Sequence, residues 1–180
     1  MECSFDEVLI SSEEIAERVR ALGAKISEKY HGQDLCVIGI LCGAVIFMAD
    51  LVRCISPSVK LSMEFIKASS YGASTQSSGD VKLAHPMKLD VKNRHVLIVE
   101  DIVDSGNTLK KLRGYFAGQG ASSVEVCALL NKKERRVTDV KIEYSGFDIP
   151  DVFVVGYGMD YNERLRNLPS VHALRFEPRQ

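Results

Sequence analysis

The sequence predicts an α/β fold in which a central, mostly parallel sheet is flanked by helices, and two patterns support this prediction. Short apolar runs, typical of strands buried on both faces, alternate along the chain with helical patterns of apolar residues. Twice, such a strand is followed by a loop of small residues and then by a helix. Ligands of open parallel sheets bind beyond the carboxyl ends of the strands, so we expect the functional residues in these loops.

The first half of the chain predicts a short apolar element at residues 8–10, a helix, a buried strand at 35–41, a second helix at 46–51 and a strand at 59–66. The first helix begins after Ser11, because Glu14 three residues later completes a capping box, and the pattern is broken at Gly32. Residues 67–80 are rich in Ser and Gly and lack apolar periodicity, which is typical either of a surface connection or of a functional lid.

The second half predicts a buried strand at 95–99 that runs directly into Glu100 and Asp101. A turn of small polar residues follows, and then a helix with an apolar stripe over 109–116. Further buried strands are predicted at 124–130 and 152–157, and an edge strand at 171–176. Lys132 directly follows one of these strands and should therefore lie on the same sheet edge as Glu100.

The turn after the central strand has the composition of an anion cradle. Its small residues leave successive backbone N–H groups free to converge before a helix N-terminus: Asp104, Ser105, Gly106, Asn107 and Thr108. Glu100 and Asp101 only accept hydrogen bonds, which suits a pair of vicinal hydroxyls or a developing positive charge. The two patterns together describe a site for ribose 5-phosphate. The alternative is a plain strand and helix with Asp104 or Ser105 as the cap, although carboxylates beside a buried strand cost desolvation.

Composition and charge exclude several functions. A chain of 180 residues with 46% hydrophobic and 26% charged residues predicts a single soluble domain over residues 1–180. The net charge of −1 gives no basis for binding nucleic acid or an anionic membrane surface. No apolar run is long enough to span a membrane, the first residues do not resemble a signal peptide, and the five cysteines lack paired spacing. We therefore expect a cytoplasmic protein.

The segment from Val99 to Thr108 resembles the phosphoribosyl-pyrophosphate motif of type I phosphoribosyltransferases. With further stretches in the family's order, the resemblance to the hypoxanthine(-guanine) phosphoribosyltransferases covers roughly residues 8–176. It implies the type I fold, with a small hood formed by the N-terminal and C-terminal segments. It also implies Mg²⁺-dependent transfer of 5-phosphoribosyl from phosphoribosyl pyrophosphate to a 6-oxopurine, namely hypoxanthine and also guanine. The family resemblance further implies a homodimer or homotetramer.

The resemblance further implies roles for individual residues. Asp104 would transfer a proton at the purine N7, and Ser70 and Tyr71 would form a lid over the site. Pyrophosphate would be contacted by Leu41, Cys42, Gly43 and Arg166, with the Leu41–Cys42 peptide as a cis bond. The purine would be held by Ile102, Lys132, Phe153, Val154 and Met159, and Mg²⁺ by Glu100, Asp101 and Asp160. Many relatives carry Lys in place of Cys42, so the backbone is expected to provide the contact there.

Two alternatives remain open at this stage. A xanthine-preferring phosphoribosyltransferase would keep the chemistry and change the base. A non-catalytic protein that senses nucleotides and regulates RNA would use the same fold, but it should carry a basic stripe, whereas Lys and Arg are balanced by acidic residues here. Lys132 is a hydrogen-bond donor, which favours a carbonyl oxygen at position 6 and disfavours adenine.

Overall fold

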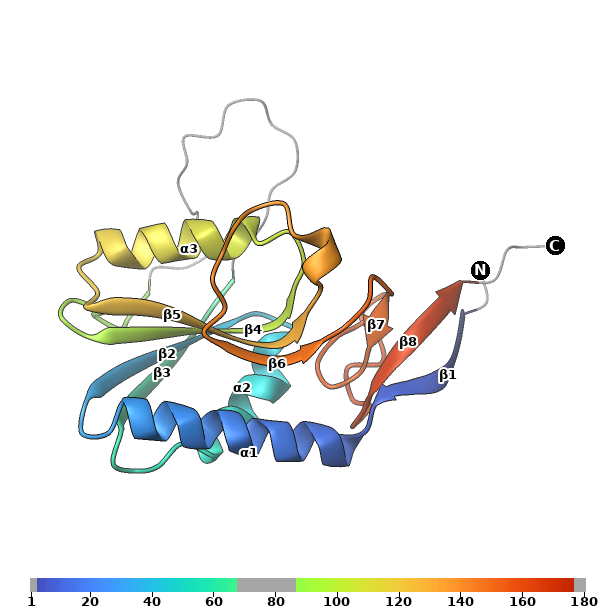
Figure 1. The fold of residues 1–180 in the computed structure, drawn as a ribbon, viewed down its shortest axis with the longest axis horizontal. Helices are drawn as coiled ribbons and strands as arrows, with labels where there is room; N and C mark the ends of the chain where they lie inside the picture. The colour runs from blue at the N-terminus through green and yellow to red at the C-terminus, as the bar shows by residue number, and fades with distance from the viewer. Residues whose placement is uncertain (1–2, 68–86, 177–180) are drawn as a thin grey trace.

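The computed structural model describes residues 3–67 and 87–176, and within them the chain forms two sheets (Figure 1). The larger sheet has five parallel strands in the order β3-β2-β4-β5-β6. In chain order these strands are β2 Asp34–Ile40, β3 Lys60–Ile66, β4 His95–Val103, β5 Ser123–Asn131 and β6 Tyr144–Asp148. The predicted α/β fold with a central parallel sheet is confirmed.

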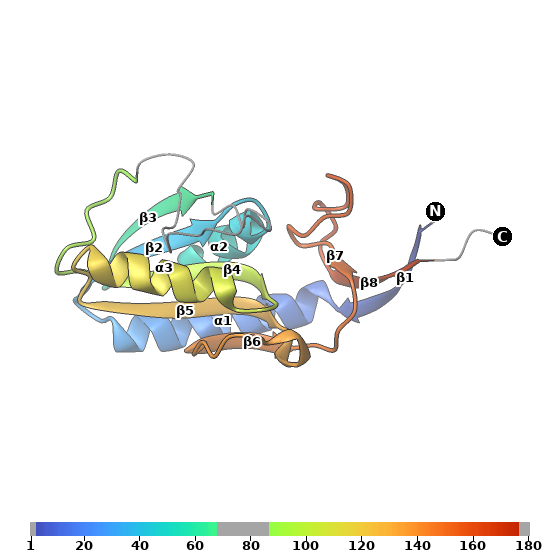
Figure 2. The same cartoon turned by 90° about the horizontal axis from the view of Figure 1, so that it is seen from above.

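Helices cover both faces of this sheet. Helices α1, Ser12–Lys29, and α2, Ala44–Arg53, pack on one face, and α3, Asn107–Gly118, packs on the other (Figures 1 and 2). Alternate residues of β4 point to opposite faces of the sheet. Leu97 and Val99 pack in the hydrophobic cluster beneath α1 and α2. Val96 and Ile98 pack in the cluster beneath α3. Within the described residues, no helix has the length and apolar composition that crossing a bilayer requires.

The change of face between α2 and α3 marks a topological switch point at the sheet edge. Strands β2 and β4 are neighbours, yet the helix after β2 lies on one face and the helix after β4 lies on the other. The chain that follows these two strands therefore runs to opposite faces of the sheet, and this topology predicts a ligand-binding crevice beyond their carboxyl ends. This is the position where open α/β sheets bind ligands.

The smaller sheet is the predicted hood. Strand β1, Cys3–Ile10, pairs antiparallel with β8, Val171–Phe176, and β8 pairs with β7, Val154–Val155. This sheet lies beyond the carboxyl ends of the parallel strands, on the side of the crevice (Figure 1). Segments from the two ends of the chain thus combine to cover the predicted ligand edge.

Helix α1 begins as its sequence predicts. Ser11 is the N-cap, its side chain accepts from the Glu14 amide, and the Glu14 carboxylate accepts from the Ser11 amide. The helix buries the stripe that includes Ile15, Val19 and Ile26 against the sheet. The reciprocal cap satisfies backbone donors that would otherwise lack a partner at the helix start.

Two predictions for strands need correction, and one strand of the structure was not predicted at all. The central strand does not end at Val99 but continues as β4 through the two carboxylates to Val103. The predicted core strand at 152–157 is only the short β7, which belongs to the hood, because Gly156 and Tyr157 adopt positive φ and end it. Strand β6 was not predicted, since its five residues include one glycine and only a weak alternation of apolar residues.

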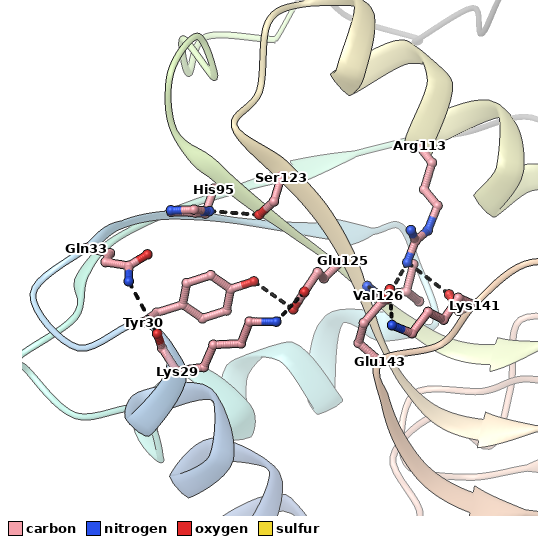
Figure 3. Close-up of polar contacts among 10 residues, drawn as sticks. All are labelled: Lys29, Tyr30, Gln33, His95, Arg113, Ser123, Glu125, Val126, Lys141 and Glu143. Carbon is pink, nitrogen blue, oxygen red and sulfur yellow. Dashed lines mark hydrogen bonds and ion pairs between the residues drawn. The ribbon is translucent and has the colours of Figure 1, made fainter.

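A polar cluster ties α1 to the sheet at the edge opposite the crevice (Figure 3). The Tyr30 hydroxyl donates to Glu125 Oε2 at 2.7 Å, and Lys29 forms an ion pair with the other oxygen of the same carboxylate. Nearby, His95 and Ser123 at the starts of β4 and β5 are hydrogen-bonded at 2.8 Å. Burial acts to raise the pKa of Glu125, but the hydrogen bonds from Lys29 and Tyr30 outweigh it and lower that pKa.

Replacement of Glu125 by Gln should therefore destabilise the fold at neutral pH, by about 1–2 kcal/mol for a charge-assisted hydrogen bond. The pKa of Glu125 is lower in the folded than in the unfolded protein, so its contribution is full above the unfolded pKa and is lost as the pH falls through the folded pKa. Urea unfolding of both proteins across this pH range measures the difference, which should shrink towards acid pH.

Glu28→Gln is the matched control, because Glu28 is exposed near the same end of α1. Its substitution should change the free energy of unfolding by less than about 0.5 kcal/mol. Equal losses in the two variants, or a Glu125→Gln loss that grows towards acid pH, would contradict the assignment.

Candidate active site

The end of strand β4 carries two carboxylates beyond its pairing with β2, while the strand is still paired with β5. Glu100 lies opposite Ala128, and Ile102 opposite Leu130, in the register with β5. The Glu100 Oε2 atom is buried and makes no hydrogen bond within the part of the chain that the structure describes. Burial, with the nearby negative charge of Asp101, raises the pKa of Glu100 well above its usual range. An acceptor in this position is available to a ligand.

Asp101 faces the loop that follows β2. A Cβ atom placed on Gly43 would lie 1.6 Å from Asp101 Oδ2, so only glycine allows this close approach of backbone and carboxylate. The Ile102 amide donates to Asp101 Oδ1 at 2.9 Å. Burial raises the pKa of Asp101, and the amide and the positive charge of Arg166 oppose this shift. The crevice thus gathers an acid from β4, a backbone loop from β2 and an arginine near the hood.

The loop after β2 has the predicted form. The Leu41–Cys42 peptide is cis, and Cys42 is an exposed free thiol. Gly43 is the N-cap of α2, has no side-chain cap, and is followed by a first turn without acidic residues. The first amides of α2 are therefore not satisfied by an acidic side chain, which suits an anion at this helix start.

The turn after β4 forms the second anion cradle. Gly106, with φ of 82°, is the N-cap of α3, and this cap also lacks a side-chain hydrogen bond. Gly106, rather than Asp104 or Ser105, is the N-cap residue, although the Ser105 hydroxyl oxygen accepts a long hydrogen bond of 3.4 Å from the Asn107 amide. The Ser105 carbonyl accepts from the amides of Val137 and Thr138 at 3.1 and 3.0 Å, which fixes the turn from outside. The two remaining predicted residues, Asn107 and Thr108, begin α3.

Lys132 lies on the other side of the β4 turn. It follows β5, is only 5% exposed, and its amide donates to the Val103 carbonyl at 3.1 Å. Its Nζ is 3.7 Å from Asp104 Oδ1, an oxygen that is buried and has no hydrogen bond among the described residues. A donor and an acceptor thus lie side by side at the same sheet edge, as the position of Lys132 in the sequence predicts.

The hood supplies the remaining side of the site. Val154 and Met159 are buried, whereas Phe153 is 44% exposed and contacts the Tyr161 ring edge to face, with centroids 5.8 Å apart. Phe153 therefore presents a partly accessible aromatic surface at the start of the hood. Such a surface is suited to stacking on a planar ligand.

Arg166 joins the hood to the crevice. It pairs with Asp160 at 2.7 Å and donates to the Gly158 carbonyl at 2.7 Å. Gly158 lies so close to the β2 loop that a Cβ there would be 2.2 Å from the Gly43 carbonyl oxygen. The predicted pyrophosphate loop and the predicted arginine are thereby brought together.

The expected metal ligands are not all brought together. Among the described residues, no group of three or more His, Cys, Asp and Glu side chains could hold a metal ion. Glu100 and Asp101 remain a fitting pair, because Mg²⁺ keeps several waters and needs only one or two carboxylates besides substrate phosphates. The predicted lid residues Ser70 and Tyr71 lie outside the described residues.

Two charged residues near Lys132 were missed by the sequence analysis. Arg135 belongs to a charge run that was interpreted as a solvated loop, and Asp151 follows Pro150 in a connection without a motif. Both form ion pairs with Lys132 or Asp104. No pattern in a single sequence pairs these residues, since β6 separates them along the chain.

An open parallel sheet with two anion cradles and an acidic pair at its switch point defines an α/β protein that binds phosphorylated ligands. The phosphoribosyl transferase domain model matches residues 9–162 of the chain. The chain therefore belongs to the phosphoribosyl transferase domain family.

Relatives and solved structures narrow the similarity within this family. The hypoxanthine-guanine phosphoribosyltransferase of Streptococcus pneumoniae (strain R6) is 44% identical over 177 residues, covering 98% of this chain and 97% of the relative. The hypoxanthine phosphoribosyltransferase of Escherichia coli (strain K12) is 44% identical over 167 residues, or 92% and 93% of the two chains. A crystal structure of a hypoxanthine phosphoribosyltransferase from Staphylococcus aureus matches with a TM-score of 0.88 and 40% identity, covering 95% of this chain and 92% of that one.

The desolvation of Glu100 makes a prediction for stability. Its pKa is higher in the folded than in the unfolded protein, so the carboxyl group opposes folding as the pH rises above the unfolded pKa, and the penalty is complete above the folded pKa. We expect Glu100→Gln to stabilise the protein at pH 8 by on the order of 1 kcal/mol. The gain should shrink as the pH falls towards the unfolded pKa and vanish below it, where Glu100 is neutral in both states.

Denaturant unfolding of wild type and variant at a series of pH values measures this gain. Asp101→Asn is the comparison variant, and it should gain less because Asp101 accepts the Ile102 amide and faces the charge of Arg166. A Glu100→Gln protein that is less stable than wild type at pH 8 would show that the carboxylate is satisfied in the fold.

Proposed function

We propose that this protein acts in purine salvage. It transfers the 5-phosphoribosyl group from phosphoribosyl pyrophosphate to N9 of hypoxanthine and also of guanine. The observation that carries the proposal is the meeting of an acidic pair, two helix starts with glycine N-caps and a donor–acceptor pair at one sheet edge. The names of the relatives support the same reaction. Each part of the two substrates has a chemically matched group in this arrangement.

The donor substrate would lie across the switch point. The turn Asp104–Thr108 would bind the 5-phosphate through its amides, and Glu100 and Asp101 would accept hydrogen bonds from the two ribose hydroxyls. The backbone of Leu41, Cys42 and Gly43 would contact pyrophosphate, together with the guanidinium of Arg166. The sugar carbon C1 is then held between the leaving pyrophosphate and the purine.

The acidic pair would also hold Mg²⁺, with Asp160 as a further carboxylate near the pyrophosphate. The buried, unsatisfied Glu100 oxygen fits this role, since a divalent cation would satisfy it. The ion supplies charge neutralisation of the leaving pyrophosphate. Loss of pyrophosphate leaves an oxocarbenium-like sugar, and the carboxylates of β4 stabilise its positive charge.

The acceptor base would lie between Lys132 and the hood. Lys132 donates to the oxygen at position 6, Phe153 stacks on the ring, and Val154 contacts the purine edge through its backbone. Ile102 and Met159 would complete the pocket. As the C1–O bond to pyrophosphate breaks and the C1–N9 bond forms, Asp104 accepts the proton that the imidazole ring loses at N7.

The direct test is to incubate the protein with phosphoribosyl pyrophosphate and Mg²⁺, adding hypoxanthine, guanine, xanthine or adenine in turn. We expect the nucleoside 5′-monophosphates of hypoxanthine and guanine, with pyrophosphate released in equal amount. Turnover only with xanthine would favour the xanthine-preferring alternative. Binding of nucleotides without turnover of any base would overturn the proposal.

Asp104→Asn tests the proton acceptor. The amide keeps the shape of the side chain but is a far weaker base, so kcat should fall by about a hundredfold or more. The dissociation constant for phosphoribosyl pyrophosphate should change little, because the turn binds the phosphate mainly through its backbone. Steady-state kinetics and calorimetric titration separate these effects.

Asp139→Asn is the control for this substitution, because Asp139 is exposed on the loop beyond the turn. It should keep wild-type kcat. Full turnover by Asp104→Asn would remove Asp104 from the mechanism and leave the substrate assignments in place.

We also propose that residues 1–180 act as one catalytic domain, that Ser70 and Tyr71 close over the bound substrates, and that the protein is a cytoplasmic homodimer or homotetramer. These statements rest on the family resemblance. Exclusion of water from the reactive sugar is the physical reason for a lid. Light scattering coupled to size-exclusion chromatography measures the subunit number.

A further inference from the structure

Four charged side chains form a closed ring next to the proposed purine site. Lys132 Nζ lies 3.7 Å from Asp104 Oδ1 and 3.8 Å from Asp151 Oδ1. On the opposite side, Arg135 lies 4.0 Å from Asp104 Oδ2 and 3.5 Å from Asp151 Oδ2. Each carboxylate thus directs one oxygen to the lysine and the other to the arginine. Positive and negative charges alternate around the ring, and their sum is zero.

The members of this ring come from three segments that converge at the sheet edge. Asp104 belongs to the turn after β4, Lys132 and Arg135 follow β5, and Asp151 lies in the connection from β6 to the hood strand β7. The Arg135 amide donates to the Lys132 carbonyl at 3.2 Å, which holds the two cations of the ring in one short helical turn. The ring therefore links the central sheet to the segment that leads to Phe153.

The distances within the ring leave its polar atoms available. All four exceed the range of about 2.7–3.2 Å for an N–H···O hydrogen bond, so these are ion pairs without tight bonds. Lys132 Nζ has almost equal distances to its two acids, and therefore neither acid draws it away from the other. Within the part of the chain that the structure describes, the buried Asp104 Oδ1 atom has no hydrogen bond, and Lys132 Nζ makes these two loose ion pairs, so both groups can contact a ligand.

We propose that Asp151 and Arg135 are positioning residues that hold Lys132 and Asp104 apart, as separate contacts for the oxygen at position 6 and for N7 of the purine. This proposal rests on the proposed function. Without Asp151, Asp104 is the one acid beside the ammonium group of Lys132 among the residues that the structure describes, and the two groups form a direct ion pair. Lys132 can then no longer donate to the purine oxygen, and Asp104 can no longer accept the proton from N7. Arg135 pairs with Asp104 and Asp151 on the side opposite Lys132, and this pairing keeps the Asp104 carboxylate from moving onto Lys132.

The exposure of the two residues separates this role from a structural one. The side chain of Arg135 is 53% exposed and that of Asp151 is 45% exposed. Ion pairs with that exposure contribute little to the free energy of unfolding. Their substitution should therefore leave the fold stable and change the purine side of the reaction selectively.

The test measures steady-state kinetics of Asp151→Asn with hypoxanthine and with phosphoribosyl pyrophosphate. A misplaced Lys132 should lower kcat/KM for hypoxanthine by between about tenfold and a hundredfold. KM for phosphoribosyl pyrophosphate and the melting temperature should stay near their wild-type values. Asp151→Glu, which keeps the charge, should recover most of the loss. Arg135→Ala should show a smaller defect of the same kind, and Arg135→Lys should reduce that defect.

Asp148→Asn and Lys133→Ala are the matched controls, because Lys133 and Asp148 form an ion pair at 2.6 Å next to the ring without belonging to it. Both should keep wild-type kinetics with both substrates. In the Asp104→Asn background, Asp151→Asn should lower hypoxanthine binding much less, since the ammonium group no longer has a charged partner on which to close.

The outcomes separate the two proposals. Wild-type protein that forms no nucleotide from any purine overturns the proposed function. Wild-type protein that is active, with an Asp151→Asn variant whose hypoxanthine kinetics are unchanged, overturns only the role of the ring. Equal losses for both substrates together with a lower melting temperature would also contradict positioning, since they indicate a structural contribution.

Discussion

One constraint governs the site, because the central strand carries two carboxylates within its paired region before it ends. β4 is paired with β2 over its first part and with β5 as far as Val103, so Glu100 and Asp101 cannot turn freely into bulk water. Burial raises the pKa of both carboxyl groups. A fold that served only stability would place apolar side chains there. The desolvation of these acids costs free energy in the folded protein. A ligand with hydroxyls or positive charge offsets that cost when it binds to them.

The same constraint explains why backbones approach so closely around these acids. Gly43 contacts Asp101, and Gly158 contacts Gly43, so that the β2 loop lies between the central strand and the chain that leads to Arg166. A side chain at either glycine would separate these layers. The β2 loop, the Asp101 carboxylate and the chain near Arg166 are thus held together, an arrangement that suits a charged, hydroxyl-rich ligand.

Much of this arrangement could be predicted from the sequence because the governing interactions are local. The capping box at Ser11 and the small-residue turns after β2 and β4 are encoded within a few residues, and so is the position of Lys132 beyond β5. Predictions failed where pairing between distant segments decided the outcome. An apolar run at 152–157 does not reveal that its partner is β8, and the extension of β4 through two acids is decided by its pairing with β5.

The roles of Arg135 and Asp151 could not be predicted for a related reason. A charge run after a strand is ordinarily solvated, and an aspartate after a proline is typical of a turn. Only the convergence of three segments turns these residues into partners of Lys132 and Asp104. Sequence patterns predict groups that contact ligands, whereas the neighbours that surround Lys132 and Asp104 are found only in the three-dimensional arrangement.

The most direct measurement is calorimetric titration of wild type and a Glu100→Gln/Asp101→Asn double variant with ribose 5-phosphate and, separately, with inorganic phosphate. If the acids hold the sugar hydroxyls and the turn holds the phosphate, the double variant binds ribose 5-phosphate at least about tenfold more weakly, a loss of roughly 1.4 kcal/mol, and binds inorganic phosphate as tightly as wild type or more tightly. Equal affinity of wild type and double variant for ribose 5-phosphate would contradict the account.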